Sequence, residues 1–366
     1  MIRKLFEKKY ETVNNYQDFW NWFLKNENKF YEVVKSGRNP EKEFFDKLSP
    51  KLAELKDGYF YLAGMCDENT AELVFTPDGV VKNVVFVEEL VDAAPVIAHW
   101  KFTALKSAME IDDIVINMAG YTFERDRFSF YAIDHQYYPD EVDIVIVYHD
   151  FNEADKDLIT NGTYLFLDNF LGELNSITSI DNLAVISKNE AVQELIPIAK
   201  LKDYLIWREK EFVEKYSGKR HNTENDVHSV MEAVLQNGRP LVAMFNRDVL
   251  EWDSKASHPW ILVIEIKYDG EDNNGMPDKE MNERFNQFEE EIMKELNDVE
   301  GYLNIGRETA DNYRTIYFAC KDFRKPSKVM HEHSKKYDAS QIEFTYDIYK
   351  DKYWQSFERF RNAQLN

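Results

Sequence analysis

The sequence predicts an α+β fold of two domains, with a ferredoxin-like, split β-α-β domain at the C-terminal end. In the last third, apolar runs and helical stripes alternate as strand, helix, strand, strand, helix, strand between about residues 260 and 348. The chain of 366 residues is also longer than one typical hydrophobic core supports. We expect the N-terminal domain to be an antiparallel-rich α+β domain.

The predicted boundary between the domains lies near residue 218. Ser217-Gly218-Lys219-Arg220 interrupts a helical bridge, which favours a break at this point. The expected domains are therefore residues 1–217 and residues 218–366. A helix is expected to follow from Thr223 to Gln236, because Asn222 or Thr223 suits its N-cap and Asn237-Gly238 suits its end.

Each element of the C-terminal domain has its own signal. Met281, Phe285, Phe288 and Ile292 recur at helical spacing, so they predict a helix with these side chains buried. Strict alternation of apolar and polar residues predicts the last strand. We expect both helices to pack on one face of the sheet. The predicted elements are strand 260–268, helix 277–297, strands 302–307 and 313–320, helix 326–337 and strand 342–348.

The two predicted helices carry opposite charge. Residues 271–300 hold eleven acidic and three basic side chains, whereas residues 321–336 hold six basic and two acidic ones. Because the helices are expected to lie side by side, the favoured interpretation is that the runs neutralise each other. The alternative is that they form two separate docking surfaces.

The N-terminal domain gives a less regular pattern. Residues 16–55 are expected to be helical, and strands are expected at 59–65, 73–76 and 80–87, the last two joined by Pro77-Asp78-Gly79. A hairpin over 127–150 should precede a helix at 153–171 and a strand at 183–186. This order repeats that of the C-terminal domain, which indicates a related unit.

The net charge of −22, from 45 basic and 67 acidic residues, restricts the partners. A chain this acidic repels phosphate backbones and anionic membrane surfaces, so we expect no direct nucleic-acid contact and no membrane contact. A protein partner, with a basic one as an option, fits the charge better. Aromatic residues make up 14% of the chain, and Tyr and Trp often anchor interfaces.

The cysteines and the apolar segments indicate a reducing compartment. Cys66 and Cys320 are far apart, so neither a disulfide framework nor a zinc–thiolate site is predicted. Residues 1–9 lack the apolar core of a signal peptide, and no apolar run approaches the ~20 residues of a membrane span. We therefore expect a cytoplasmic protein.

The histidines do not predict a metal site. With the hairpin turn near Asp140, His135 should face Val145 and His149 should face Tyr131, which separates the two rings by ~13 Å. In the string His331-Glu332-His333, side chains two positions apart on a helix point in different directions and cannot share one ion. We expect no metal.

Sequence signatures of catalysis and nucleotide binding are absent too. The chain contains no G-x-S-x-G, no G-x-x-x-x-G-K-[ST] and no G-x-G-x-x-G string, and only 13 glycines. Carboxylates are so abundant that none can be singled out as a general acid or base. We therefore predict no cofactor and assign no catalytic residue.

Short strings in the last third resemble an uncharacterised bacterial family, catalogued as domain of unknown function number six-nine-five. The resemblance covers about Pro240 to Phe360. That family in turn resembles the regulator of ribonuclease E activity, type B, an acidic inhibitor that binds the nuclease. The resemblance implies a protein partner. The family has no established catalytic residues, so the resemblance assigns none to this chain. The strings are His258-Pro259-Trp260, Gly275-Met276-Pro277, Gly306-Arg307-Glu308-Thr309, Tyr317-Phe318 and Lys352-Tyr353-Trp354.

Together these observations favour a non-catalytic protein that binds or regulates another protein. Two alternatives stay open: an immunity-type inhibitor that masks a basic toxin or nuclease, and an enzyme acting on a small molecule between the domains. The candidate binding residues are acidic residues of the first C-terminal helix and aromatic residues of the tail. They are Glu289, Glu290, Glu291, Tyr353 and Trp354.

Overall fold

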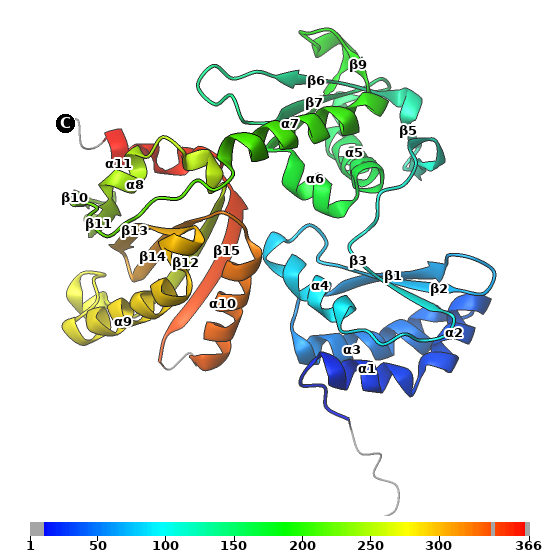
Figure 1. The fold of residues 1–366 in the computed structure, drawn as a ribbon, viewed down its shortest axis with the longest axis horizontal. Coiled ribbons are helices and arrows are strands. Elements are labelled where there is room, and N and C mark those ends of the chain that lie inside the picture. Colours follow the sequence, from blue (N-terminus) through cyan, green and yellow to red (C-terminus); the bar gives the residue numbers. More distant parts are fainter. Residues whose placement is uncertain (1–10, 338–340, 363–366) are drawn as a thin grey trace, which may run out of the picture. The chain divides into compact units, whose positions relative to one another are not determined.

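The computed structural model describes residues 11–337 and 341–362, and it confirms the α+β class. The described residues form two compact units. Figure 1 labels their helices and strands. One comprises the described residues up to Ile114 with Tyr164–Ile177, and the other comprises Val115–Thr163 and the described residues from Thr178 onward. The boundary near residue 218 stays a prediction. Residues 1–10, where we expect no signal peptide, lie outside the described residues.

The first unit packs helices against a three-stranded sheet of order β1-β2-β3. Strands β1 and β2 are antiparallel, and β3 lies parallel to β2. Aromatic rings join the two layers, for example Phe19 with Phe75 and Trp20 with Phe102. The elements are α1 (Tyr16–Leu24), α2 (Glu27–Ser36), α3 (Asp46–Leu55), β1 (Phe60–Met65), β2 (Ala71–Thr76), α4 (Val84–Asp92) and β3 (Trp100–Ala104).

The strand predicted at residues 80–87 is wrong, because most of that segment is helical. The helix α4 begins at Val84, and Val84, Val85, Phe86 and Val87 are all buried. A short, fully apolar run gives no periodicity that separates a buried strand from a buried helix. The free edge of β2 is instead occupied by β3, which pairs along Ala71–Phe75.

The second unit contains a four-stranded sheet of order β8-β7-β6-β9. All six residues of β7 are buried, as expected for an inner strand. The chain passes between the units within α5 and α6. The elements are β4 (Val115–Met118), β5 (Tyr121–Glu124), β6 (Phe128–Ile133), β7 (Asp143–Tyr148), α5 (Lys156–Leu171), α6 (Glu173–Ser179), β8 (Asn182–Ser187), β9 (Ile196–Pro197) and α7 (Leu201–Tyr216).

The predicted hairpin forms, but its register differs by four residues from the expected one. Tyr131 lies opposite Val145, so the predicted pairing of Tyr131 with His149 is wrong. Strand β6 ends at Ile133, which places His135 in the connection and not in the ladder. The predicted order of hairpin, helix and strand is present, but β8 lies parallel to β7, whereas all strands of the C-terminal sheet pair antiparallel, so the related unit stays a prediction.

The larger sheet of this unit has six strands in the order β10-β11-β13-β14-β12-β15. Strands β12 to β15 and the helices between them follow the predicted element order. The ferredoxin-like name stays a prediction. The elements are β10 (His228–Val234), β11 (Pro240–Asn246), α8 (Arg247–Glu251), β12 (Trp260–Lys267), α9 (Lys279–Glu295), β13 (Tyr302–Ala310), β14 (Tyr313–Cys320), α10 (Arg324–Lys336), β15 (Glu343–Lys350) and α11 (Glu358–Asn362).

Both faces of this sheet carry apolar side chains. Helices α9 and α10 cover one face, where Phe285, Phe288 and Ile292 are buried and Met281 is half-buried. The ring of Phe288 lies 5.3 Å from that of Tyr337, at the end of α10. Tail and α8 side chains pack against the other face. That core contains Ala243, Phe245, Val249, Leu250, Ile261, Leu303, Ile305, Tyr317, Ala319, Trp354, Phe357 and Phe360.

The helix predicted from Thr223 to Gln236 is wrong. Residues His228–Val234 form the edge strand β10, which pairs antiparallel with β11. The Asn237-Gly238 step closes a hairpin and does not end a helix, since Leu235 N–H donates to the carbonyl of Arg239 at 2.8 Å. The Asn237-Gly238 turn and the pairing of β10 with the next strand, β11, decide the conformation here, and the helix-cap signals do not.

None of the helices in the described part of the chain combines the length and apolar character that a membrane span requires.

Candidate functional site

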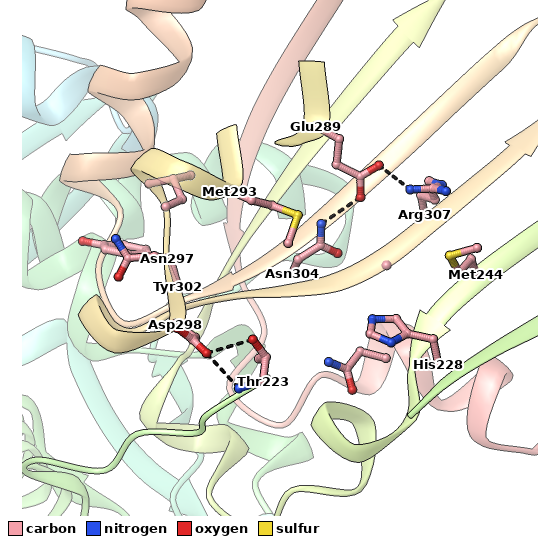
Figure 2. A pocket seen from close by; sticks show the side chains of 13 residues that line it. Thr223, His228, Met244, Glu289, Met293, Asn297, Asp298, Tyr302, Asn304 and Arg307 are labelled. Carbon is pink, nitrogen blue, oxygen red and sulfur yellow. Dashed lines mark hydrogen bonds and ion pairs between the residues drawn. The ribbon is translucent and has the colours of Figure 1, made fainter. Parts of the chain in front are cut away.

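The main candidate site is a groove on the face of the six-stranded sheet that carries α9 (Figure 2). Helix α9 forms one wall, strands β11 and β13 form the floor, and β10 lies at the rim. The hollow at one end has a volume of about 310 Å³. It is lined by Thr223, His228, Met244, Asn246, Glu289, Met293, Leu296, Asn297, Asp298, Tyr302, Asn304, Gly306 and Arg307.

The floor of the groove contains a β-bulge at Gly306. The register between β13 and β14 shifts between Asn304 and Gly306, and Gly306 has a φ of +143°. A Cβ atom at this position would lie 2.2 Å from the carbonyl oxygen of Met244 on β11. Only glycine therefore lets β11 and β13 approach each other here.

The helical wall is fixed to the floor by Glu289, which is 5% exposed. One carboxylate oxygen accepts from Asn304 Nδ2 at 2.8 Å, and the other accepts from Arg307 Nη1 at 2.7 Å (Figure 2). A buried carboxylate needs such partners, because burial removes its hydration. Both oxygens of Glu289 are engaged, so this group is a structural ion pair and not a free base.

At the near end of the groove, Asp298 ties two loops together. Its carboxylate accepts from the backbone N–H of Thr223 at 2.7 Å and from the Thr223 hydroxyl at 2.8 Å. Burial alone would raise the pKa of Asp298, but these donors and the N–H of Val299 lower it below its usual value. The loop before β10 is thereby held against the loop after α9.

A second hollow of about 410 Å³ continues the groove toward the start of α9. It shares Met244 and Arg307 with the first hollow. Its base is formed by the guanidinium of Arg314, a residue that is only 3% exposed. The other lining residues are Val242, Met276, Pro277, Asp278, Lys279, Asn282 and Thr309.

The uncovered part of the sheet beside α9 carries apolar side chains on either side of one exposed carboxylate, Glu232, which pairs with Val242. Val230 on β10 pairs directly with Met244 on β11, so both side chains lie on the face of the groove. Val230 is 58% exposed and Val234 is 74% exposed. Met293, on the wall, is 43% exposed. Apolar side chains gathered on one exposed face are typical of a binding surface.

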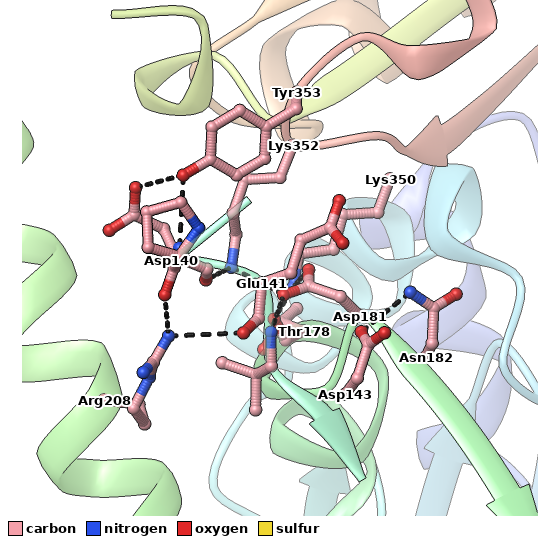
Figure 3. Close-up of polar contacts among 12 residues, drawn as sticks. Asp140, Glu141, Asp143, Thr178, Asp181, Asn182, Arg208, Lys350, Lys352 and Tyr353 are labelled. Carbon is pink, nitrogen blue, oxygen red and sulfur yellow. Dashed lines mark hydrogen bonds and ion pairs between the residues drawn. The ribbon is translucent and has the colours of Figure 1, made fainter. Parts of the chain in front are cut away.

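A second cluster of charged groups lies where the tail meets the hairpin between β6 and β7 (Figure 3). Asp181 is paired with Lys350 and with Lys352, each at 2.6 Å, and all three side chains are mostly buried. Burial alone would raise the pKa of Asp181, but these two cations lower it. Asp140 accepts from Lys215 Nζ at 2.8 Å and from the hydroxyl of Tyr353.

In the same region, His135, Glu141 and Asp143 place one potential metal ligand each within 4.8 Å of one another. Their atoms already have protein partners. Asp143 bonds to the ring of His135 at 2.7 Å and to Asn182, and Glu141 accepts from Gln355. Burial, and then the charge of Asp143, raise the pKa of Glu141. His149 lies elsewhere on the sheet, where its ring bonds to Ser129.

The structure separates the five predicted binding residues. Glu290 is exposed, and Glu291 accepts from Lys336 and Tyr337, both at 2.6 Å. Glu289 is buried in the groove wall, and Trp354 is 2% exposed with its indole N–H donating to the carbonyl of His258 at 2.9 Å. Tyr353 contacts Asp140 in the second cluster. Two ion pairs, Lys336–Glu291 and Lys325–Glu300, join the acidic and basic segments, and neutralisation of the whole runs stays a prediction.

Sequence reasoning did not predict the groove, because it assigned β10 as a helix and left β11 unassigned. One feature of the sequence did indicate the floor of the groove. A glycine inside an apolar strand indicates a bulge or a close backbone approach, and Gly306 fulfils both roles. Met276 and Pro277, from another of the short strings, also line the groove.

Residues 231–360 match a family described as a family of unknown function, DUF695. This match confirms the resemblance predicted for the C-terminal third, and it begins within β10. The further resemblance to the regulator of ribonuclease E activity stays a prediction. The chain matches no curated protein and no solved structure.

Proposed function

We propose that this protein is a non-catalytic binding module whose groove beside α9 receives an amphipathic helix of a partner protein. The observation that carries this proposal is the uncovered strip of sheet formed by β10 and β11. Helices α9 and α10 pack over the rest of that face, so a third helix would complete the layer.

The dimensions of the strip suit a helix. Two adjacent strands span roughly 10 Å, and packed helices lie roughly 8–10 Å apart. A helix laid on β10 and β11 would therefore contact α9 on one side. Its apolar stripe would cover Val230, Val234, Val242 and Met244, of which Val230 and Val234 are exposed.

The groove offers less to a catalytic role. Glu289 is engaged by Asn304 and Arg307, and Asp298 is engaged by Thr223. His228 is exposed at the rim. The Thr223 hydroxyl lies beside the Asp298 carboxylate, but the backbone N–H of Thr223 binds the same carboxylate oxygen, so this pair ties two loops together. The site therefore fits binding better than acid–base chemistry.

An immunity-type role, in which the partner is a basic toxin or nuclease, is the second candidate. The net charge of −22 supports it, because charge complementarity accelerates association with a basic protein. In that case the partner should associate faster at low salt. Because the same charge repels phosphate backbones, we also propose that the protein makes no direct nucleic-acid contact.

The test uses a library of displayed random 16-residue peptides selected on the full chain. Met244→Trp fills the centre of the groove, and Val192→Trp, at an 82% exposed position outside it, is the matched control. We expect selected peptides to bind the wild-type chain and the control, and to lose binding to Met244→Trp. Both variants should first give wild-type melting temperatures. If no peptide is enriched, or if Met244→Trp binds equally well, the groove is not the binding site.

A further inference from the structure

Arg314 is a buried cation at the base of the second hollow. Its guanidinium donates through Nε to Thr309 Oγ1 at 3.1 Å, through Nη1 to Asn286 Oδ1 at 3.0 Å and through Nη2 to Asn282 Oδ1. All three acceptors are uncharged. One N–H on each of Nη1 and Nη2 has no acceptor among the described residues, and Arg314 lines the hollow.

Arg314 has no direct ion pair, although the nearby charge of Glu289 favours its charged form. Among the described residues, no carboxylate pairs with it, whereas Arg307 pairs with Glu289 and Arg239 pairs with Glu271 and Asp311. Burial, followed by the charge of Arg307, lowers the pKa of Arg314 to about 10, so the group stays charged at neutral pH. A buried charge without a counter-ion is unfavourable, and an incoming anion would relieve that cost.

We propose that the helix bound in the groove carries one carboxylate side chain, Asp or Glu, that pairs with Arg314. This inference rests on the proposed function and names the chemistry of its partner. A guanidinium with free N–H groups on both terminal nitrogens matches the two oxygens of a carboxylate.

The observations favour a single carboxylate among apolar residues. Arg314 is a single cation without a direct ion pair, and Val242, Met244 and Met276 form the apolar part of a lining that also contains Asp278, Lys279, Asn282, Arg307 and Thr309. The net charge of −22 would repel an acidic run or a phosphorylated segment at long range. A partner that is basic overall would be attracted by the net charge of this chain. One acidic residue on its apolar stripe would then pair with Arg314.

The experiment takes a peptide that is selected by the wild-type chain and lost by Met244→Trp. Its affinity is compared with that of the same peptide with the acidic residue changed to Gln or Asn, by titration calorimetry on the full chain. We expect the neutral peptide to bind roughly 10- to 100-fold more weakly. A third peptide carries phosphoserine at that position, and we expect it to bind less well than the carboxylate peptide.

On the protein side, Arg314→Met should reduce the difference in affinity between the acidic and neutral peptides to less than about 3-fold. This is the result that a double-mutant cycle gives when the two changed groups contact each other. Arg284→Met, at a more exposed position of α9 outside the groove, is the control and should keep the full difference. If Arg314→Met does not fold, the peptide exchange on the wild-type chain still decides the question.

The two proposals fail in different ways. Groove-dependent peptides that lack an acidic residue, or equal affinity for the acidic and neutral forms, overturn the role of Arg314 and leave the groove as a binding site. Tighter binding of the phosphoserine peptide overturns the choice of carboxylate. Absence of any groove-dependent peptide overturns the proposed function itself.

Discussion

Glu289 Oε2 lies 2.7 Å from Nη1 of Arg307, and this ion pair joins helix α9 to strand β13 across the wall of the groove. The carboxylate side chain is 6% exposed and the arginine side chain is 24% exposed. The pair therefore sits where screening by water is weak, and its loss leaves one charge poorly solvated.

Glu289→Ala is expected to lower the free energy of unfolding by about 2 kcal/mol, because it leaves Arg307 and Asn304 without their shared acceptor. The neighbouring Glu290→Ala, at an exposed position, is the control and should change it by less than about 0.5 kcal/mol. Urea denaturation of both variants measures the difference. Equal effects would show that the buried ion pair contributes no more than a surface charge.

Gly306→Ala is expected to destabilise the chain by about 3 kcal/mol or more. Its φ of +143° disfavours any side chain, and its Cβ would meet the Met244 carbonyl at 2.2 Å. Gly64→Ala, in strand β1 of the first unit, meets no atom within 4 Å and should cost less than about 1 kcal/mol. Thermal unfolding followed by circular dichroism compares the two. A folded Gly306→Ala variant with unchanged stability would contradict the bulge geometry.

Asp181→Asn is expected to cost about 3 kcal/mol, since two buried lysines, Lys350 and Lys352, would lose their shared counter-ion. Lys215→Ala removes the ion pair with Asp140, but that lysine side chain is 51% exposed. We expect this control to change the free energy of unfolding by less than about 1 kcal/mol. Chemical denaturation distinguishes the two variants, and a neutral Asp181→Asn would mean that the pair is hydrated in solution.

His258 should make stability depend on pH. Its side chain is fully buried, and burial, followed by the charges of Arg220 and Lys321, lowers its pKa to about 4 from 6.5. The unfolded state therefore binds a proton more readily, so stability falls as the pH drops from about 6.5 to about 4. The expected loss over that window is about 3 kcal/mol.

His258→Gln removes this titrating group, so the variant should lose less stability than wild type over the same pH window. The comparison uses the difference between the two proteins at each pH, because carboxylates common to both also titrate. Parallel stability curves for wild type and variant would refute the assignment.

Chelator treatment is expected to leave the melting temperature unchanged. The groups that come closest to a metal site, His135, Glu141 and Asp143, already bond to one another or to Asn182 and Gln355. A shift of several degrees, or stoichiometric metal in elemental analysis of the purified protein, would contradict this expectation.

The sequence by itself determined the elements whose signals are local and long. The stripe of Phe285, Phe288 and Ile292 fixes the buried face of α9, and the Asp311-Asn312 step fixes the hairpin between β13 and β14, where both residues have positive φ. Periodicity and turn chemistry depend on neighbours along the chain, so they can be interpreted without a structure.

The existence and position of the groove could be seen only in the tertiary structure. Residues His228–Val234 have no strong local preference, and pairing with β11 makes them a strand, which extends the sheet beyond α9 and creates the groove. The burial of Arg314 among uncharged acceptors depends on α9 and β13, which the sequence places apart. The Asn237-Gly238 turn encodes only the β10–β11 hairpin, whereas the long-range pairing of β11 with β13 and the burial of Arg314 depend on the tertiary structure.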